Sequence, residues 1–295
     1  MRTLRAGDTV GVVATGFAVR PKELRAGVAR LRRKGLNVVV GTHTEVASGY
    51  LAGTDEQRLE DLNRALRDPA LDAIWFARGG YGTARLLPGV DWRAWRRHPR
   101  LFVGYSDLTA LFAAADRRGL GRCVLGPVVT QLNDRRSFHG PSLRAALAGR
   151  AHRITIRRRQ ILAPGRASGR LVGGNLTVLS HLCGTRAFPD LRKAVLFLED
   201  VGEPTYRVDR MLTQLRQAVP LDRVAGVLLG DIRTTPRRRF PPDRDLDDVL
   251  AESFAGLGVP VVAGLPAGHL PGNHSLPLGG TARIDTTAGS VELIP

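Results

Sequence analysis

The feature that most constrains the fold is an alternation of short apolar strands and helices in the first half of the chain. Residues 9–14 (TVGVVA) form an apolar run that predicts a buried strand, and residues 22–33 carry leucine and valine at helical spacing. Residues 36–40 (LNVVV) predict the next strand. A strand, a helix and a second strand in this order are typical of a βαβ unit and a parallel sheet.

The same alternation continues to about residue 126. It predicts helices over 55–66, 83–87 and 108–115, and strands over 73–77, 101–104 and 123–126. Sites in open parallel sheets gather beyond the carboxyl ends of the strands. Loops that follow these strands are therefore the first places to look for function.

The amino-acid composition changes between residues 132 and 168. This stretch is rich in arginine and predicts one short helix over 141–147 and one strand over 153–156, so we interpret residues 133–168 as a linker. The division predicted is an N-terminal α/β domain over 1–132 and a second domain over 169–295. The second domain is predicted to contain several further strands and a closing hairpin at the C-terminus.

Composition limits the class of protein. The 295 residues are 43% hydrophobic and 24% charged, which is typical of a soluble globular protein, and no run approaches the roughly 20 apolar residues of a membrane span. The two cysteines, Cys123 and Cys183, exclude a disulfide framework and fit a reducing compartment. The first residues do not follow the signal-peptide pattern, so we expect a cytoplasmic location.

The net charge of +17 is strongly basic. A basic surface attracts acidic partners, including nucleic acids. The basic residues are spread along the chain, only three of the 44 are lysine, and no nucleic-acid-binding module accompanies the densest runs at 30–33, 157–159 and 237–239. We therefore expect no nucleic-acid partner and no membrane partner.

The stretch 101–111 (LFVGYSDLTAL) carries the first candidate for chemistry. It predicts the end of a buried strand, a turn at Gly104, and a helix that Asp107 caps. Ser106 then lies at the tip, with its hydroxyl near the positive end of the helix dipole, as in a nucleophile elbow. An ordinary capped turn explains the same residues, because the second glycine of the elbow motif is absent.

A serine hydroxyl becomes a good nucleophile when a histidine takes its proton and a carboxylate orients that histidine. His269 follows an apolar strand and a glycine, and His274 is its rival. Glu199 ends another apolar strand, where a carboxylate would be half buried. Other acids close by in the sequence are Asp200, Glu203 and Asp209.

A developing oxyanion needs backbone N–H donors. The N–H of Asp107 is one candidate, and the glycine-rich loop 78–82 (RGGYG) could supply another from Gly79 or Gly80. An ordinary tight turn is the alternative for this loop. A phosphate loop is disfavoured because neither glycine signature of nucleotide-binding loops is present.

Six segments in order make the chain recognisable: 50–55 (YLAGTD), 78–82, 104–107 (GYSD), 173–176 (GGNL), 198–200 (LED) with 206–212 (YRVDRML), and 264–269. Together they closely resemble the LD-carboxypeptidase family of serine peptidases, which includes muramoyl-tetrapeptide carboxypeptidase and microcin-immunity peptidases. The resemblance runs from about Gly7 to the C-terminus.

The resemblance implies a catalytic triad of Ser106 as nucleophile, His269 as general base and Glu199 as the orienting carboxylate. With it we expect Gly80 and Asp107 as oxyanion donors. We expect substrate contacts from Arg78, Gly79, Tyr105 and Asn175. It also implies an N-terminal doubly wound, mostly parallel sheet with a smaller β-rich C-terminal domain, a homodimer, and no metal or other cofactor.

The reaction that the resemblance implies is release of the terminal D-alanine from murein tetrapeptide, in cytoplasmic cell-wall recycling. One alternative is a peptidase of the same chemistry that acts on a peptide-nucleotide antibiotic or a related toxin. Another is a non-catalytic protein that binds an anionic ligand. The sequence departs from the family at Leu125, where histidine is common, and we expect this position to bear on substrate choice.

Overall fold

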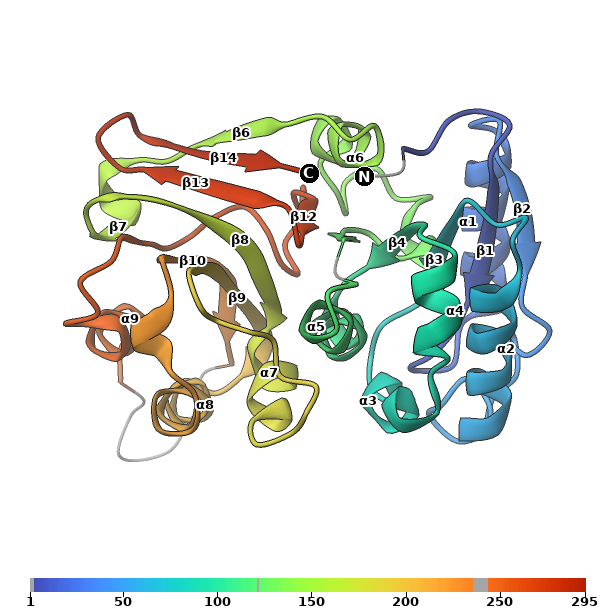
Figure 1. The fold of residues 1–295 in the computed structure, drawn as a ribbon, viewed down its shortest axis with the longest axis horizontal. Helices are drawn as coiled ribbons and strands as arrows, with labels where there is room; N and C mark the ends of the chain where they lie inside the picture. The colour runs from blue at the N-terminus through green and yellow to red at the C-terminus, as the bar shows by residue number, and fades with distance from the viewer. Residues whose placement is uncertain (1–2, 121, 236–243) are drawn as a thin grey trace.

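A computed structural model describes residues 3–120, 122–235 and 244–295, so the basic run at 237–239 lies outside the described residues. Figure 1 shows two sheets side by side, with helix α5 (Thr109–Arg117) between them. The arrangement confirms the predicted α/β fold class.

The first sheet has six strands in the order β12-β5-β4-β3-β1-β2. Five of them are parallel and come from the predicted alternation, whereas β12 pairs antiparallel with β5. The bounds are β1 Thr9–Val13, β2 Asn37–Val40, β3 Ala73–Phe76, β4 Leu101–Gly104, β5 Cys123–Leu125 and β12 Leu276–Leu278.

Helices cover both faces of this sheet. Apolar residues of α1 and α6 pack with Val10, Trp75 and Val103 on one face, whereas α2, α4 and α5 pack with Ile74 and Phe102 on the other. This is the doubly wound arrangement, in which buried parallel strands have apolar side chains on both sides. The helices are α1 Pro21–Arg32, α2 Asp55–Arg67, α3 Thr83–Leu86, α4 Trp92–Arg97 and α6 Gly140–Leu147.

The second sheet has eight strands in the order β6-β14-β13-β8-β9-β10-β11-β7. Its centre is parallel from β8 to β11, and its outer strands are antiparallel, including the predicted hairpin of β13 and β14. The strands are β6 His152–Thr155, β7 Ile161–Ala163, β8 Arg166–Asn175, β9 Ala194–Glu203, β10 Gly226–Thr234, β11 Val261–Val262, β13 Thr281–Asp285 and β14 Ser290–Ile294.

Three helices pack against this sheet: α7 Leu176–Leu182, α8 Thr205–Ala218 and α9 Leu246–Phe254. Short 3₁₀ turns complete the chain: η1 Leu87–Gly89, η2 Ser106–Leu108, η3 Val129–Gln131, η4 Arg158–Gln160 and η5 Leu221–Arg223. No helix within these described ranges has the length and apolar character needed to cross a bilayer.

The segment 133–168 takes part in the second sheet. Its strands β6 and β7 form the two edges of that sheet, so residues expected to be a linker contribute to its eight strands. In the other direction, β12 from the C-terminal half joins the first sheet. The division at 132 and 169 stays a prediction, with strands exchanged across it.

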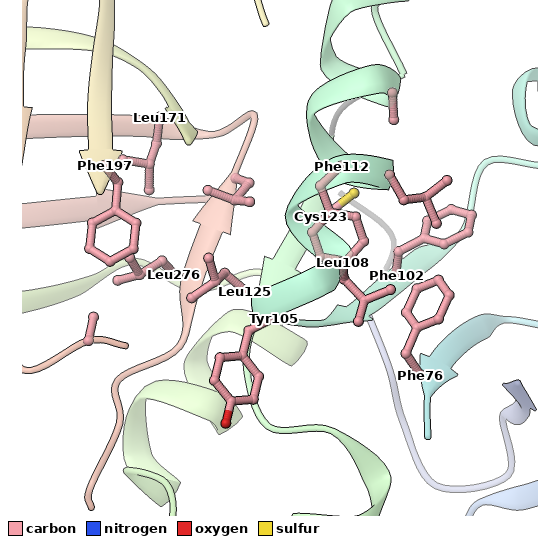
Figure 2. Close-up of a cluster of buried hydrophobic side chains, with 14 of the residues drawn as sticks. Phe76, Phe102, Tyr105, Leu108, Phe112, Cys123, Leu125, Leu171, Phe197 and Leu276 are labelled. Atoms are coloured by element: carbon pink, nitrogen blue, oxygen red, sulfur yellow. The ribbon is translucent and has the colours of Figure 1, made fainter. Parts of the chain in front are cut away.

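One hydrophobic core links the two sheets. Figure 2 shows Phe76 and Phe102 of the first sheet, Leu108 and Phe112 around the start of α5, and Phe197 of β9 in the same cluster. On its other side, α5 turns a row of alanines, including Ala110, Ala113 and Ala114, toward β8 and α7. Small side chains let this helix approach the second sheet closely, so the strand end that carries Ser106 is held against the second half of the chain.

Candidate active site

Ser106 follows β4 and starts the turn η2 before α5. Its φ is 64°, and only one other non-glycine residue in the described part of the chain has a positive φ. Left-handed backbone is costly for a residue with a Cβ, by about 1–3 kcal/mol, and persists where the surrounding structure imposes it. This strained strand-to-helix turn is the geometry of a nucleophile elbow. Ser106 is half-buried between buried Tyr105 and Asp107.

The loop after β3 lies directly against Ser106. A Cβ on Gly79 would lie 3.1 Å from the Cβ of Ser106 and 3.4 Å from its Oγ, so the absence of a side chain lets the loop come this close. Gly80 has a φ of 107° and packs against the ring of Phe17. Among the backbone hydrogen bonds of the described turns and loops, none has the N–H of Gly80 or of Asp107 as its donor.

The expectation that Asp107 caps α5 is wrong. Helix α5 has no side-chain cap, and the buried carboxylate of Asp107 instead accepts a 2.9 Å hydrogen bond from the N–H of Thr83. Burial raises the pKa of this carboxyl group. Because Thr83 starts α3, the Asp107 carboxylate ties the end of the glycine loop to the serine turn.

Glu199 and His269 meet across two elements of the second half of the chain. The Nδ1 atom of His269 lies 2.7 Å from Oε2 of Glu199. The Glu199 side chain is fully buried, whereas that of His269 is 19% exposed. Asn175 donates its side-chain N–H to the other oxygen of Glu199 at 3.3 Å. This pairing leaves Nε2 of the imidazole available for a proton transfer.

Burial and the ion pair set the protonation of these two groups. Burial raises the pKa of the Glu199 carboxyl group, while its hydrogen bond to His269 opposes that shift. Burial alone would lower the pKa of His269, but the hydrogen bond and negative charge of Glu199 outweigh it, and the pKa is raised above 6.5. Glu199 therefore favours the protonated imidazole, which is the form that follows proton abstraction from a serine.

A bulge in β10 makes room for this pair. Two residues, Gly230 and Asp231, stand opposite Glu199 of β9, and the N–H of Asp231 donates to the carbonyl of Ala267. A Cβ on Gly268 would lie 3.1 Å from Oε2 of Glu199. The bulge and the glycine let the loop that carries His269 dock on the strand that carries Glu199.

The other acids and the rival histidine point elsewhere. The carboxylate of Asp200 accepts hydrogen bonds from the N–H and hydroxyl of Thr177, and Glu203 pairs with Arg207. His274 stacks on His139, with ring centroids 4.0 Å apart. These contacts distinguish between the alternatives that the sequence left open. Of the candidate acids and histidines, only Glu199 and His269 pair with each other.

Two contacts connect this pair to the serine turn. Thr109, three residues after Ser106, accepts a 2.9 Å hydrogen bond from the N–H of Asn175, whose amide reaches Glu199. The ring of Tyr105, next to Ser106, lies 4.8 Å from the imidazole of His269. These residues close a contact ring, defined as Tyr105, Ser106, Thr109, Asn175, Glu199 and His269. In the described chain, no hydrogen bond joins Ser106 Oγ to His269.

The predicted substrate contacts differ in exposure. Arg78 is partly buried, donates to the carbonyl of Ala18 at 2.5 Å and lies over the ring of Phe17. The hydroxyl of buried Tyr105 accepts a hydrogen bond from Gln131, and burial raises its pKa. Asn175 is buried behind Glu199 and also accepts the N–H of Val178.

Leu125 is fully buried in β5, opposite Leu276 of β12. Figure 2 shows both side chains in the core cluster near Tyr105. Any influence of this position on substrate choice therefore has to pass through packing, because Leu125 does not line an exposed surface.

Several supporting residues are not predicted from the sequence. Asn273 accepts the N–H of Gly268, and Arg233 donates to the carbonyl of His269, so both fix the histidine loop. Tyr50 and Tyr81 are 60% and 47% exposed, and Tyr50 packs on Tyr81 of the glycine loop. Tyr50 lies in a segment of the family resemblance, which was the available signal; Asn273 and Arg233 have none, because their contacts depend on the loop conformation.

No group of three or more His, Cys, Asp or Glu side chains is placed to hold a metal ion in the part of the chain that the structure describes. The expectation of a site without metal or cofactor stays a prediction. The arrangement offers a hydroxyl on a strained turn, an oriented imidazole and unpaired N–H donors, which are the groups used in acyl transfer.

Comparison with known proteins agrees with this geometry. Residues 10–124 match the model of the LD-carboxypeptidase N-terminal domain, and residues 168–284 match that of the C-terminal domain. The chain is 42% identical to a putative carboxypeptidase of Streptomyces coelicolor, over 98% of this chain and 94% of that protein. It is 36% identical to the murein tetrapeptide carboxypeptidase of Pseudomonas aeruginosa, over 94% and 92%.

Solved structures give the same result. The muramoyltetrapeptide carboxypeptidase of Oxalobacter formigenes superposes with a TM-score of 0.86 at 28% identity, over 97% of both chains. The microcin C7 self-immunity protein MccF superposes with a TM-score of 0.87 at 25% identity, over 99% of this chain and 97% of its own. Since both halves match the family models and the curated relatives align over nearly the full length, this chain belongs to the LD-carboxypeptidase family.

Proposed function

We propose that this protein is a serine-type LD-carboxypeptidase that releases the terminal D-alanine of murein tetrapeptide. The single observation that carries the proposal is the contact ring, because it brings a serine on a strained turn together with a glutamate-paired imidazole from distant parts of the chain. The names of relatives that align along most of the chain support the substrate.

In the proposed reaction, His269 takes the proton of Ser106, and the serine oxygen attacks the carbonyl that precedes the terminal D-residue. The N–H groups of Gly80 and Asp107 bind the oxyanion. His269 then protonates the leaving amine, and water hydrolyses the acyl-enzyme with His269 again as the base. No hydrogen bond joins Ser106 to His269 among the described residues, and we expect this bond to form when the substrate binds, as catalytic hydrogen bonds often do.

Other residues position these groups. We assign Asn175 to holding the Glu199 carboxylate, in place of the substrate contact expected from the sequence, because its amide is used inside the protein. Arg78 and Tyr81 belong to the glycine loop, and with the exposed ring of Tyr50, which packs on Tyr81, they supply a surface for the substrate. A homodimer and a cytoplasmic location stay predictions, which gel filtration with light scattering and cell fractionation would test.

The test of the proposal is D-alanine release from purified murein tetrapeptide by the native protein and by Ser106→Ala. We expect loss of all measurable turnover in the variant and an unchanged rate in Ser137→Ala, a serine on another loop whose hydroxyl donates only to backbone carbonyls. Undiminished release by Ser106→Ala would refute the assignment of the nucleophile.

The similarity to the microcin C7 self-immunity protein MccF favours the alternative expected from the sequence, a peptide-nucleotide antibiotic or a related toxin. Turnover of murein tetrapeptide and of an aminoacyl sulfamoyl nucleotide should be measured side by side with the same preparation. We expect the larger kcat/KM for the murein peptide. A larger kcat/KM for the nucleotide substrate, with both activities lost in Ser106→Ala, would support the proposed reaction mechanism but would identify the nucleotide as the preferred substrate.

A further inference from the structure

A cavity of about 520 Å³ lies away from the contact ring, on the face of the first sheet that α1 and α6 cover. It is lined by residues that precede β1 and β2, such as Leu4 and Leu36, together with parts of the two helices. Ser106 and the glycine loop instead follow the carboxyl ends of their strands. The cavity and the candidate active site therefore open at different edges of the sheet.

The floor of this cavity is apolar. Buried Leu31, Leu132 and Leu143 line it together with the side chain of Trp75. The indole N–H of Trp75 donates to the carbonyl of Pro127, so the ring is held in place and its one hydrogen-bond donor already has an acceptor. The volume falls within the roughly 300–1,000 Å³ of small-molecule sites, which are mostly apolar with a few placed polar groups.

All charged side chains that line the cavity are cationic, and we refer to them as its rim. Five basic side chains line it, and no acidic side chain does. They are Arg5, Arg30, Lys34, Arg135 and Arg144. Among the described residues, none of the five forms an ion pair with a carboxylate, whereas 13 other arginines do.

The nearest acids in the sequence do not neutralise this rim. Asp8 accepts the backbone N–H of Arg5, and Asp134 accepts the backbone N–H of Arg136. Both carboxylates are thus used to shape turns. Five like charges around one opening repel each other, and an anion at that opening relieves the repulsion.

A second arginine-lined cavity shows the contrast. It has about 560 Å³ and is lined by Arg96, Arg100, Arg122 and Arg170, but also by Asp116. Arg170 lies 3.0 Å from the carboxylate of Asp116, and Arg100 donates to the carbonyl of Ala65. Three of its four arginines, Arg96, Arg100 and Arg170, have protein partners, whereas no described residue forms an ion pair with a cation of the 520 Å³ cavity.

We propose that the 520 Å³ cavity binds a small amphipathic anion, a molecule with an apolar body and a single carboxylate or phosphate head group. The apolar body packs on Trp75 and the leucines of the floor, and the head group lies among the cations of the rim. This site is separate from the peptidase reaction and gives part of the unusual basic charge a binding role.

The test uses 8-anilinonaphthalene-1-sulfonate, an amphipathic anion whose fluorescence rises in apolar surroundings, with the full-length protein. We expect one dye per chain at saturation. Dodecanoate and dodecyl phosphate, each below its micelle concentration, should displace the dye, and their relative affinities distinguish a carboxylate from a phosphate ligand. Dodecanol alone or inorganic phosphate alone should displace it poorly, because each lacks one half of the recognised chemistry.

The site is located with charge-reversal variants. Arg135→Glu combined with Arg144→Glu should raise the dissociation constant of the dye at least about tenfold, the equivalent of 1.4 kcal/mol. The matched control is Arg186→Glu combined with Arg216→Glu, two exposed arginines outside the cavity with the same change in net charge, which should leave the constant nearly unchanged. All four positions are exposed, so both proteins are expected to fold, and urea midpoints check this.

Equal weakening in both double variants would mean that the dye responds only to net charge and would overturn the proposal. Displacement of the dye by murein tetrapeptide would place it in the peptidase cleft and would also overturn it. Ser106→Ala should bind the dye as the native protein does, so the outcome does not depend on the proposed catalytic role of that serine.

Discussion

Ser106 combines a strained backbone conformation with a close contact to the glycine loop. Its φ of 64° strains the backbone, and the glycine loop packs against its Cβ. The strain holds the hydroxyl clear of the sheet, and the missing side chain of Gly79 leaves room for it. At the scale of the residue, the site therefore depends both on the strained turn at Ser106 and on the absence of a side chain at Gly79.

Gly79→Ala tests that dependence. The new Cβ would lie 3.1 Å from the Cβ of Ser106, closer than most real contacts, so the serine or the loop must shift. Because a misplacement of 1 Å can cost about 10² in rate, we expect a fall in kcat/KM of about 10–100-fold with a small change in stability. Gly140→Ala is the control, since its new Cβ would approach only the flexible end of Arg144. An unchanged kcat/KM for Gly79→Ala would show that the close approach has no role in the reaction.

Glu199→Gln tests the charge behind the imidazole. The native pKa of His269 is raised above 6.5 by Glu199, and the general base must be neutral, so kcat/KM should rise with pH through an apparent pKa above 6.5. The amide removes the negative charge, so this acidic limb should move to lower pH, and the maximal rate should fall by about 10³–10⁴. Full pH profiles of both proteins provide the measurement. A limb that stays in place would mean that a different group sets it.

At the scale of elements, the site forms where secondary structure departs from regularity. A bulge in β10 opposite Glu199 admits the histidine loop, and the turn η2 delays the start of α5 by one turn after Ser106. The junction of α5 and β8 then depends on Thr109 and on Gly174, whose missing side chain leaves space for the threonine. The two halves of the contact ring thus meet through one hydrogen bond to a backbone N–H and through the contact between the rings of Tyr105 and His269.

Thr109→Val removes that hydrogen bond with little change in shape. The buried N–H of Asn175 would lose its acceptor, and leaving such a donor unpaired costs about 1–3 kcal/mol. We expect a loss of unfolding free energy of this size in urea titrations, together with reduced kcat, because Asn175 also positions Glu199. Thr213→Val, at an exposed position of α8, should change neither quantity. Native stability and native kcat in Thr109→Val would show that this hydrogen bond contributes neither to folding nor to the reaction.

At the scale of the whole molecule, we expect half-buried histidines to make stability depend on pH. His152 of β6 and His274, which precedes β12, lie close together with His139 at the start of α6. Burial lowers the pKa values of His152 and His274 to about 4, and the neighbouring His139 adds to the shift. The cluster lies where the C-terminal half supplies a strand to the first sheet, so its protonation opposes the joining of the two halves.

The sign of this effect follows from linkage. Between pH 6.5 and pH 4 the unfolded chain binds protons at these histidines that the folded chain does not, so their contribution to stability falls as the pH is lowered. His152→Leu should show a smaller loss of urea midpoint across this range than the native protein. His181→Leu, an exposed histidine of α7, should follow the native curve. Parallel curves for all three proteins would contradict the assignment.

Much of this architecture is predictable from the sequence because it follows hydrophobic periodicity. The predicted strands and helices of the first 126 residues occur in the predicted order, and most of them bury an apolar face or run. Helix α4 is an additional element that is not predicted from the sequence, and β2 is largely exposed. Other features depend on contacts between distant residues. The addition of β12 to the first sheet and the partner of the Asp107 carboxylate belong to this class, because three residues or one side chain carry no periodic signal.

The same limit applies to the candidate site. Ser106 and His269 could be proposed from turn and loop patterns, but Glu199 and Asp200 are neighbours with the same chemistry. Only the bulge and the facing loop decide that Glu199 meets His269 while Asp200 faces Thr177. The resemblance implies Glu199, and Glu199 is the acid that contacts His269, while the catalytic role of the pair stays a prediction.

The central claim, that Ser106 is a nucleophile activated by His269, is tested most directly by mapping where a fluorophosphonate probe attaches. After incubation and digestion, mass spectrometry should find one phosphonylated residue, Ser106, in the native protein, and His269→Ala should slow that labelling strongly. Labelling of other serines with Ser106 unmodified, or labelling of Ser106 at an equal rate in His269→Ala, would contradict the claim.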